Sequence, residues 1–165
     1  MSIHIEDETG LNWPFSLQET ADSVLQAVLE RLECPYEAEA DLLVTTDEEI
    51  RDINRRTRGI DAATDVLSFP TADYAVPADF DGLEEQDDVF DPETGVYFMG
   101  DIVISADHAK AQSEAYGHSL KREVAFLITH SLLHLTGFDH MEEEMRLQME
   151  QLQDEILDGI GITRA

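Results

Sequence analysis

The stretch Leu120–Leu135, LKREVAFLITHSLLHL, is the part of the chain that decides the fold. Its apolar residues occupy most of the circumference of a helix, whereas a surface helix concentrates them on one side. Ser119 before the stretch is a candidate N-cap, and Gly137 after it is a candidate stop signal. We therefore predict a helix from Leu120 to Leu135 that is buried in the core, with the other elements packed around it.

Shorter patterns on either side of this helix predict four strands and four more helices. Ser16 with Glu19, and Thr46 with Glu49, form capping boxes that begin two of the helices. Because strands and helices mix without a steady alternation, the pattern favours an α+β fold, and 165 residues suit a single domain spanning 1–165. The expected strands are 2–6, 39–45, 64–69 and 97–105, and the expected helices are 17–32, 46–56, 107–116 and 141–157.

Residues 72–96 differ in composition from the rest of the chain. The segment, ADYAVPADFDGLEEQDDVFDPETGV, is rich in Asp and Glu and contains two prolines and two glycines. Such a composition is typical of an exposed loop with little packing. We expect an acidic exposed loop with weak hydrogen-exchange protection and early proteolytic cleavage.

The charge balance excludes a generally basic protein that coats nucleic acid. Ten Lys and Arg residues against 37 Asp and Glu residues give a net charge of −27. Four of the cations nevertheless fall within eight residues, as Arg51, Arg55, Arg56 and Arg58. A solvated helix face explains such a cluster, and so does a contact with phosphate, which guanidinium groups bind in bidentate fashion.

The first residues and the cysteine content predict a cytoplasmic location. The first residues, MSIHIEDETG, lack the basic and apolar regions of a signal peptide. No apolar run is long enough for a transmembrane helix, so no membrane partner is expected. The single cysteine, Cys34, cannot form an internal disulfide and is consistent with a reducing compartment.

Three of the six histidines lie close together, in the stretch HSLLHLTGFDH. His130 and His134 are four residues apart, so a helix places both imidazoles on one face. Gly137 permits a sharp turn that can bring His140 back toward them. Three nitrogens and an open fourth position form a catalytic type of zinc site, although histidine also suits copper, nickel or iron. Buried hydrogen-bonded histidines are the alternative, and we expect His4, His108 and His118 to be ordinary polar residues.

The spacing of these histidines is similar to the metal-binding motif of metzincin proteases. Those enzymes carry a glutamate after the first histidine, where it acts as general base. The present chain has Ser131 at that position, and serine cannot accept a proton near neutral pH. The pattern thus predicts a metzincin-like histidine-bearing helix without the peptidase base.

Three motifs in order along the chain resemble the YbeY family of bacterial rRNA maturation factors. HSLLHLTGFDH resembles the family signature H-G-x-L-H-L-x-G-Y-D-H, and the segments RGIDAATDVLSFP (Arg58 to Pro70) and GDIVIS (Gly100 to Ser105) resemble two further motifs. The departures are Ser131 for glycine, Phe138 for tyrosine and Ala63 for proline, and none removes a ligand.

This resemblance implies a small mixed sheet flanked by helices and a metal-dependent endoribonuclease specific for single-stranded RNA. It implies action on the 3′ end of small-subunit (16S) rRNA and in ribosome quality control, with the small ribosomal subunit as partner and no DNA. The implied ligands of one Zn²⁺ per chain are His130, His134 and His140. The arginine of the R-G motif falls on Arg58.

In the mechanism that we expect, a water activated by zinc attacks or assists at phosphorus, and Arg58 stabilises the phosphoryl charge. Arg55 and Arg56 are weaker candidates for positioning the RNA. Asp139, next to a ligand, either orients an imidazole, acts as a base or caps the turn. Asp101 is either a sheet-edge carboxylate or part of a cleft wall. Two other functions stay open: a non-catalytic ribosome factor with a structural zinc, and a metallopeptidase-like hydrolase that finds its base elsewhere.

Overall fold

A computed structural model describes residues 2–139 and 142–163, and it has the α+β architecture expected from the sequence. In chain order the elements are β1 (Ser2–Asp7), α1 (Leu17–Arg31), β2 (Ala38–Thr45), α2 (Asp47–Arg58), β3 (Val66–Pro70), the 3-10 turn η1 (Leu83–Glu85), β4 (Tyr97–Ser105), α3 (Ala106–Tyr116), α4 (Leu120–Leu135) and α5 (Glu143–Gly159).

The four strands form one mixed sheet in the order β1-β2-β4-β3. β1, β2 and β4 are parallel, and β3 pairs antiparallel with β4. β4 is therefore an inner strand, and its buried residues Ile102 and Ile104 lie next to Leu42 and Val44 of β2. β3 is an edge strand, so the segment that enters it from α2 passes around an edge of the sheet.

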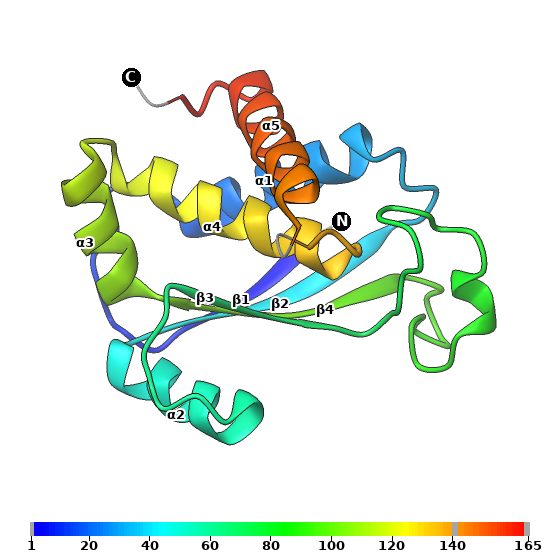
Figure 1. Cartoon of the computed structure of the whole chain (residues 1–165), viewed down its shortest axis with the longest axis horizontal. Coiled ribbons are helices and arrows are strands. Elements are labelled where there is room, and N and C mark those ends of the chain that lie inside the picture. Colours follow the sequence, from blue (N-terminus) through cyan, green and yellow to red (C-terminus); the bar gives the residue numbers. More distant parts are fainter. Residues whose placement is uncertain (1, 140–141, 164–165) are drawn as a thin grey trace.

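The helices cover the two faces of the sheet unequally. α1, α4 and α5 lie on one face, and α2 lies alone on the other (Figure 1). The main core fills the first side, where α4 contacts α1, α3, α5 and the sheet. A smaller apolar cluster around Ile50, Leu67 and Val103 holds α2 against the second face.

The central position of α4 confirms the expectation of a buried helix. The hydroxyl of Ser119 accepts a hydrogen bond from the backbone N–H of Arg122 at 3.0 Å, which fixes the first turn. The helix also buries two charged side chains, Arg122 and Glu123, that its apolar pattern does not predict. Glu123 is satisfied by Gln112 and His118, each at 2.6 Å. Buried charges without such partners would destabilise the core by several kcal/mol.

Residues 72–96 are more tightly packed than expected for an exposed loop. Their carboxylates are exposed, but the segment also contains η1 and four buried apolar side chains: Ala72, Phe80, Leu83 and Val89. The hydroxyl groups of Tyr74 and Tyr97 lie 2.6 Å apart, which ties the segment to β4. The prediction of little packing is therefore wrong, because apolar anchors spaced between the acidic residues do not form a periodic pattern that sequence analysis can detect.

The same segment supports the turn that follows α4. The backbone N–H of Ala78 donates to the carbonyl of Thr136 at 2.8 Å. Gly137 has φ +98°, and a Cβ atom at this position would lie 2.5 Å from the Cβ of Tyr74. Glycine is thus required at this turn both for its backbone conformation and for the close approach of residue 74.

Replacing Leu83 with Ala tests whether the 72–96 segment is part of the core. Leu83 is 1% exposed, so its truncation is expected to lower the free energy of unfolding by about 2–4 kcal/mol, as for other buried leucines. Urea unfolding measures this loss, and Val76→Ala, at an exposed position of the same segment, is the matched control. Equal stabilities of the two variants would show that the segment is a loose loop after all.

No helix within the described part of the chain has the length and apolar character that crossing a membrane requires.

Candidate active site

His130 and His134 lie one turn apart on α4 and face each other. Their Nε2 atoms are 3.0 Å apart, and the ring centroids are separated by 4.6 Å with the planes nearly perpendicular. Two nitrogen lone pairs repel at this distance. A proton or a cation between the two atoms is therefore needed to hold this geometry.

The outer nitrogens of the two rings have their own partners. The Nδ1 of His134 lies 2.8 Å from the backbone carbonyl of Phe138, in the turn after α4. The Nδ1 of His130 lies 2.6 Å from the side-chain amide of Gln153 on α5. Metal-binding histidines use their second nitrogen in this way, because such a bond fixes the orientation of the ring.

The arrangement of the pair fits a zinc ion. Two nitrogens at about 2.0–2.1 Å from a tetrahedral zinc are about 3.3 Å apart, close to the observed separation of 3.0 Å. The third predicted ligand, His140, lies outside the described residues. Within the described residues no group of three potential ligands is brought together, so the three-histidine, metzincin-like arrangement stays a prediction.

Ser131, which follows the first histidine, points away from the pair. Its side chain is fully buried, and its hydroxyl lies 2.6 Å from the hydroxyl of Ser68 on β3. This hydrogen bond between α4 and the sheet explains why a serine is accommodated here. It also engages the hydroxyl of Ser131 with the sheet.

A cavity of about 190 Å³ borders His130. Asp65 enters its wall from the start of β3, although the sequence analysis did not single this residue out. Its carboxylate accepts hydrogen bonds from the backbone N–H of Val66 at 2.8 Å and from the hydroxyl of Thr64 at 3.3 Å. Its position within the TDVLSF motif was the available signal. The lining residues are Asp65, Phe126, Leu127, His130, Arg146, Met149, Glu150 and Gln153.

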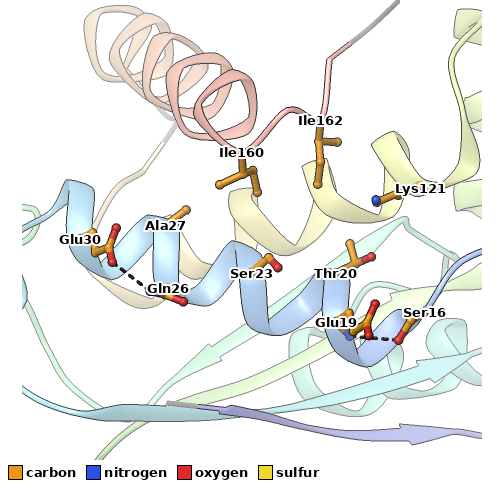
Figure 2. A pocket seen from close by; sticks show the side chains of 10 residues that line it. All are labelled: Ser16, Glu19, Thr20, Ser23, Gln26, Ala27, Glu30, Lys121, Ile160 and Ile162. Atoms are coloured by element: carbon orange, nitrogen blue, oxygen red, sulfur yellow. Dashed lines mark hydrogen bonds between the residues drawn. The ribbon is translucent and has the colours of Figure 1, made fainter.

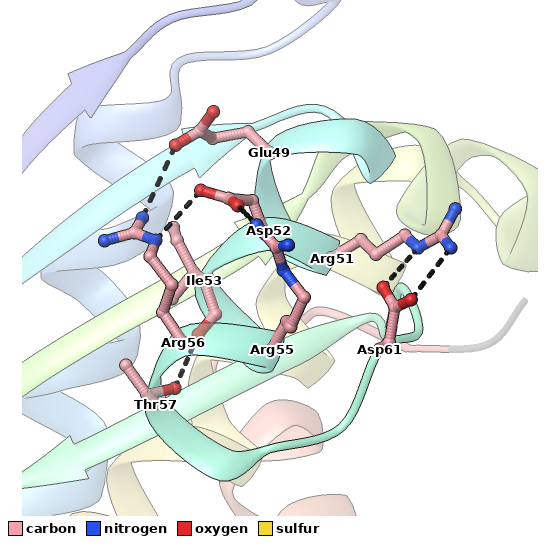
Figure 3. A network of polar contacts seen from close by, with 8 residues as sticks. All are labelled: Glu49, Arg51, Asp52, Ile53, Arg55, Arg56, Thr57 and Asp61. Carbon is pink, nitrogen blue, oxygen red and sulfur yellow. Dashed lines mark hydrogen bonds and ion pairs between the residues drawn. The ribbon is translucent and has the colours of Figure 1, made fainter.

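Three of the four clustered arginines are paired with neighbouring carboxylates (Figure 3). Arg55 and Arg56 both contact Asp52, with Arg56 Nε at 2.9 Å. Arg51 forms a bidentate pair with Asp61 at 2.8 and 3.2 Å. The hydrogen bond from Arg51 lowers the pKa of Asp61, and that from Arg55 lowers the pKa of Asp52. Arg55 and Arg56 are thus both engaged by the carboxylate of Asp52.

Arg58 differs from its neighbours. It is the last residue of α2, it is exposed, and its guanidinium has no hydrogen-bond or ion-pair partner among residues 2–139 and 142–163. Gly59, with φ +71°, ends the helix directly after it. α2 and α4 lie on opposite faces of the sheet (Figure 1), so the structure brings His130 and His134 together but does not place Arg58 in contact with them.

The histidines outside the cluster are paired with carboxylates, as expected for ordinary polar residues. His4 lies 3.0 Å from Glu39, and His118 lies 2.6 Å from the buried Glu123. His108 contacts Asp47, which also accepts a hydrogen bond from Ser105. Partial burial works to raise the pKa of Asp47, but the hydrogen bonds from Ser105 and His108 hold it below its ordinary value.

Asp139 and Asp101 have the following positions. Asp139 is exposed, and its backbone N–H lies 3.2 Å from the sulfur of Met145. Asp101 belongs to the inner strand β4 and stands beside Asp41 of β2, in the wall of a hollow of about 570 Å³. Burial, followed by the charge of Asp41, raises the pKa of Asp101. Asp101 is thus part of a cleft wall, and not a sheet-edge carboxylate.

A further hollow, of about 400 Å³, lies between α1 and the residues that follow α5 (Figure 2). Its side chains include Glu19, Glu30 and Lys121, which come from different turns and elements. In Figure 2 the carboxylates of Glu19 and Glu30 lie at opposite ends of the hollow. This arrangement does not converge on one point, in contrast to the histidine pair.

Comparison with known proteins identifies the family of the chain. The family profile described as Endoribonuclease YbeY matches residues 2–161. Curated proteins named Endoribonuclease YbeY are similar over nearly the whole length. The protein from Lachnoclostridium phytofermentans is 49% identical over 99% of this chain and 100% of its own, and that from Agathobacter rectalis is 51% identical with the same coverage.

The solution structure of TM1509 from Thermotoga maritima has the same fold. The two structures align with a TM-score of 0.57 over 96% of this chain and 91% of the other, at 20% sequence identity. The two curated relatives are identical to this chain at about half of the aligned positions, so they show the family as well as the fold. The chain belongs to the YbeY endoribonuclease family.

Proposed function

We propose that this chain is a zinc-dependent endoribonuclease that cuts single-stranded RNA, with the 3′ end of small-subunit rRNA on the small ribosomal subunit as its substrate. Membership of an endoribonuclease family implies an RNA substrate. The observation that carries the metal dependence is the convergence of two imidazole Nε2 atoms at 3.0 Å, each with its outer nitrogen engaged.

In this proposal His130, His134 and His140 hold one zinc ion per chain. When bound, zinc supplies a Lewis acid for phosphate oxygens and makes water a nucleophile near neutral pH. The carbonyl of Phe138 orients His134, and the amide of Gln153 orients His130. Phe126, Leu127 and Met149 form the apolar part of the cavity wall beside His130.

Arg58 is proposed to stabilise charge on the phosphoryl oxygens. Its guanidinium is not committed to a carboxylate in the described part of the chain, unlike those of Arg55 and Arg56. The 59–65 segment passes around the β3 edge and ends at Asp65, beside His130. An extended RNA strand that follows this edge would meet Arg58 on one side of the sheet and the histidine pair on the other.

The net charge of −27 favours one other function, that of a non-catalytic ribosome factor with a structural zinc. So acidic a chain repels phosphates over much of its surface, which weakens any general affinity for RNA. A peptidase function has less support, because Ser131 replaces the usual base and is hydrogen-bonded to Ser68.

A cleavage assay separates these functions. The purified chain is incubated with single-stranded RNA and with casein, each with zinc and with a chelator. We expect RNA cleavage that the chelator abolishes and added zinc restores, with casein intact. His130→Ala, purified in the same way, controls for contaminating nucleases. Absence of turnover by the zinc-loaded chain would favour the structural-zinc function, and cleavage of casein would favour the peptidase.

A further inference from the structure

We infer that Gln153 is a positioning residue that switches His130 between a hydrogen-bonded form and a metal-binding form. Its side-chain amide contains both a donor and an acceptor, and a half-turn of the amide exchanges them at the Nδ1 of His130. The inference rests on the proposed zinc site and adds to it a residue of α5 that no sequence motif indicates.

Gln153 is placed where its amide must bond to the histidine. It is 1% exposed and lies on the buried side of α5 with Met149, Ile156 and Leu157. Its amide nitrogen is 2.6 Å from the Nδ1 of His130. A buried amide without a partner destabilises a fold by about 1–3 kcal/mol, so this contact is required whichever end of the amide makes it.

The tautomer of His134 follows from its outer partner. The carbonyl of Phe138 can only accept a hydrogen bond, so the Nδ1 of His134 carries the proton and donates it at 2.8 Å. The Nε2 of the neutral ring then has a lone pair that points toward His130. His134 is therefore already in the form that a metal requires.

The orientation of the Gln153 amide selects the tautomer of His130, because the two rings share their Nε2 contact. When the amide nitrogen of Gln153 donates to Nδ1, the neutral ring carries its proton on Nε2 and donates it to the Nε2 of His134 at 3.0 Å. The three contacts form one directed chain from Gln153 through His130 and His134 to the carbonyl of Phe138. In this form His130 has no lone pair for a metal at Nε2.

A half-turn of the Gln153 amide reverses the first link of the chain. The amide oxygen then faces Nδ1 and accepts a proton from it, so the ring loses its proton at Nε2 and gains one at Nδ1 through exchange with solvent. The net charge of the ring is unchanged. Both Nε2 atoms then present lone pairs to the same point, which is the state that binds zinc.

The position of α5 is fixed by a second buried residue. Arg122 of α4 is 2% exposed and donates to the backbone carbonyl of Ile162 at 3.1 Å, just beyond the end of α5. It also lies 3.4 Å from the carboxylate of Asp154, the residue next to Gln153. The amide of Gln153 can thus rotate while its backbone stays in place.

Nitrogen NMR of the histidine rings tests the switch in the unchanged chain. At about pH 8, where an ordinary imidazole is neutral, the metal-free protein should show His130 with its proton on Nε2 and His134 with its proton on Nδ1. After addition of zinc, both rings should carry the proton on Nδ1. A tautomer of His130 that is the same in both states, or binding of zinc through its Nδ1, would overturn the inference.

Substitutions at Gln153 provide a second test, with zinc affinity measured by competition with a chromophoric chelator. Gln153→Met keeps the length of the side chain but removes the acceptor, so zinc affinity should fall by about 10–100-fold. Gln153→Glu keeps an acceptor and should bind zinc at least as tightly as the unchanged chain, while its metal-free form is less stable because it cannot donate. Gln151→Met, at an exposed position of the same helix, should leave the affinity unchanged.

The two levels of the proposal fail in different ways. If His130→Ala binds zinc as tightly as the unchanged chain, the proposed zinc site itself is wrong. If His130→Ala loses zinc but Gln153→Met retains it fully, the site stands and Gln153 has no part in it. Should Gln153→Met not fold, the tautomers of the unchanged chain decide the question.

Discussion

The His134→Ala variant is expected to release most of its zinc. Removing one of the three proposed ligands leaves a two-ligand site, and metal affinity depends strongly on the number of donors. The thermal stability that zinc confers should disappear as well. A ligand that binds only the folded chain adds about 2.7 kcal/mol at a concentration of 100 times its Kd, and a variant that cannot bind it gains nothing.

The measurement compares melting temperatures with zinc and with chelator, together with metal content. The difference between the two temperatures isolates the effect of the metal from the lost hydrogen bond between His134 and Phe138. His4→Ala, which removes an exposed histidine of β1, is the matched control and should keep both metal and stabilisation. Full zinc occupancy in the His134→Ala protein would sink the ligand assignment.

The Arg58→Ala variant is expected to keep its zinc and lose its activity. Arg58 is exposed and has no side-chain partner in the described part of the chain, so its truncation should leave melting temperature and metal content nearly unchanged. RNA cleavage should fall by about 10²–10³-fold, as when other preorganised charge-stabilising groups are removed. Arg58→Lys should restore activity only in part, because an ammonium group cannot form the bidentate contact of a guanidinium.

Arg55→Ala is the matched control for this experiment. Arg55 is also exposed and lies on the same helix, but it is paired with Asp52. Loss of the Arg55 side chain should slightly weaken both RNA binding and the salt dependence of that binding, with little effect on turnover. Wild-type turnover in zinc-loaded Arg58→Ala protein would show that this guanidinium belongs to a solvated helix face.

Local signals in the sequence were sufficient for most of the secondary structure. α4 and β4 have the predicted bounds, because Ser119 caps one and a mostly apolar run, YFMGDIVIS, marks the other. α2 extends to Arg58, two residues beyond the expected end, because Gly59 adopts the left-handed conformation only after that residue. The pairing of His130 with His134 was also predictable, since two positions of one helix settle it.

The remaining parts of the site depend on contacts between distant residues. Gln153 lies 23 positions after His130, and Ser68 lies 63 positions before Ser131. A local pattern does not specify which residues of two helices meet, because that depends on how the helices pack. A glutamine four residues after Met149, on an otherwise buried helix face, was the one available hint of Gln153. The buried anchors of the 72–96 segment were hidden by the acidic residues around them.

The place of α5 in the chain has a consequence for the order of events during translation. All four strands and α4 precede Glu143, so they are synthesised before α5. Because a nascent chain folds from its N-terminal part onward, the four strands can begin to pair before α5 has left the ribosome. The growing polypeptide thus starts its sheet first, and His130 meets its partner Gln153 only when the final helix packs against α4.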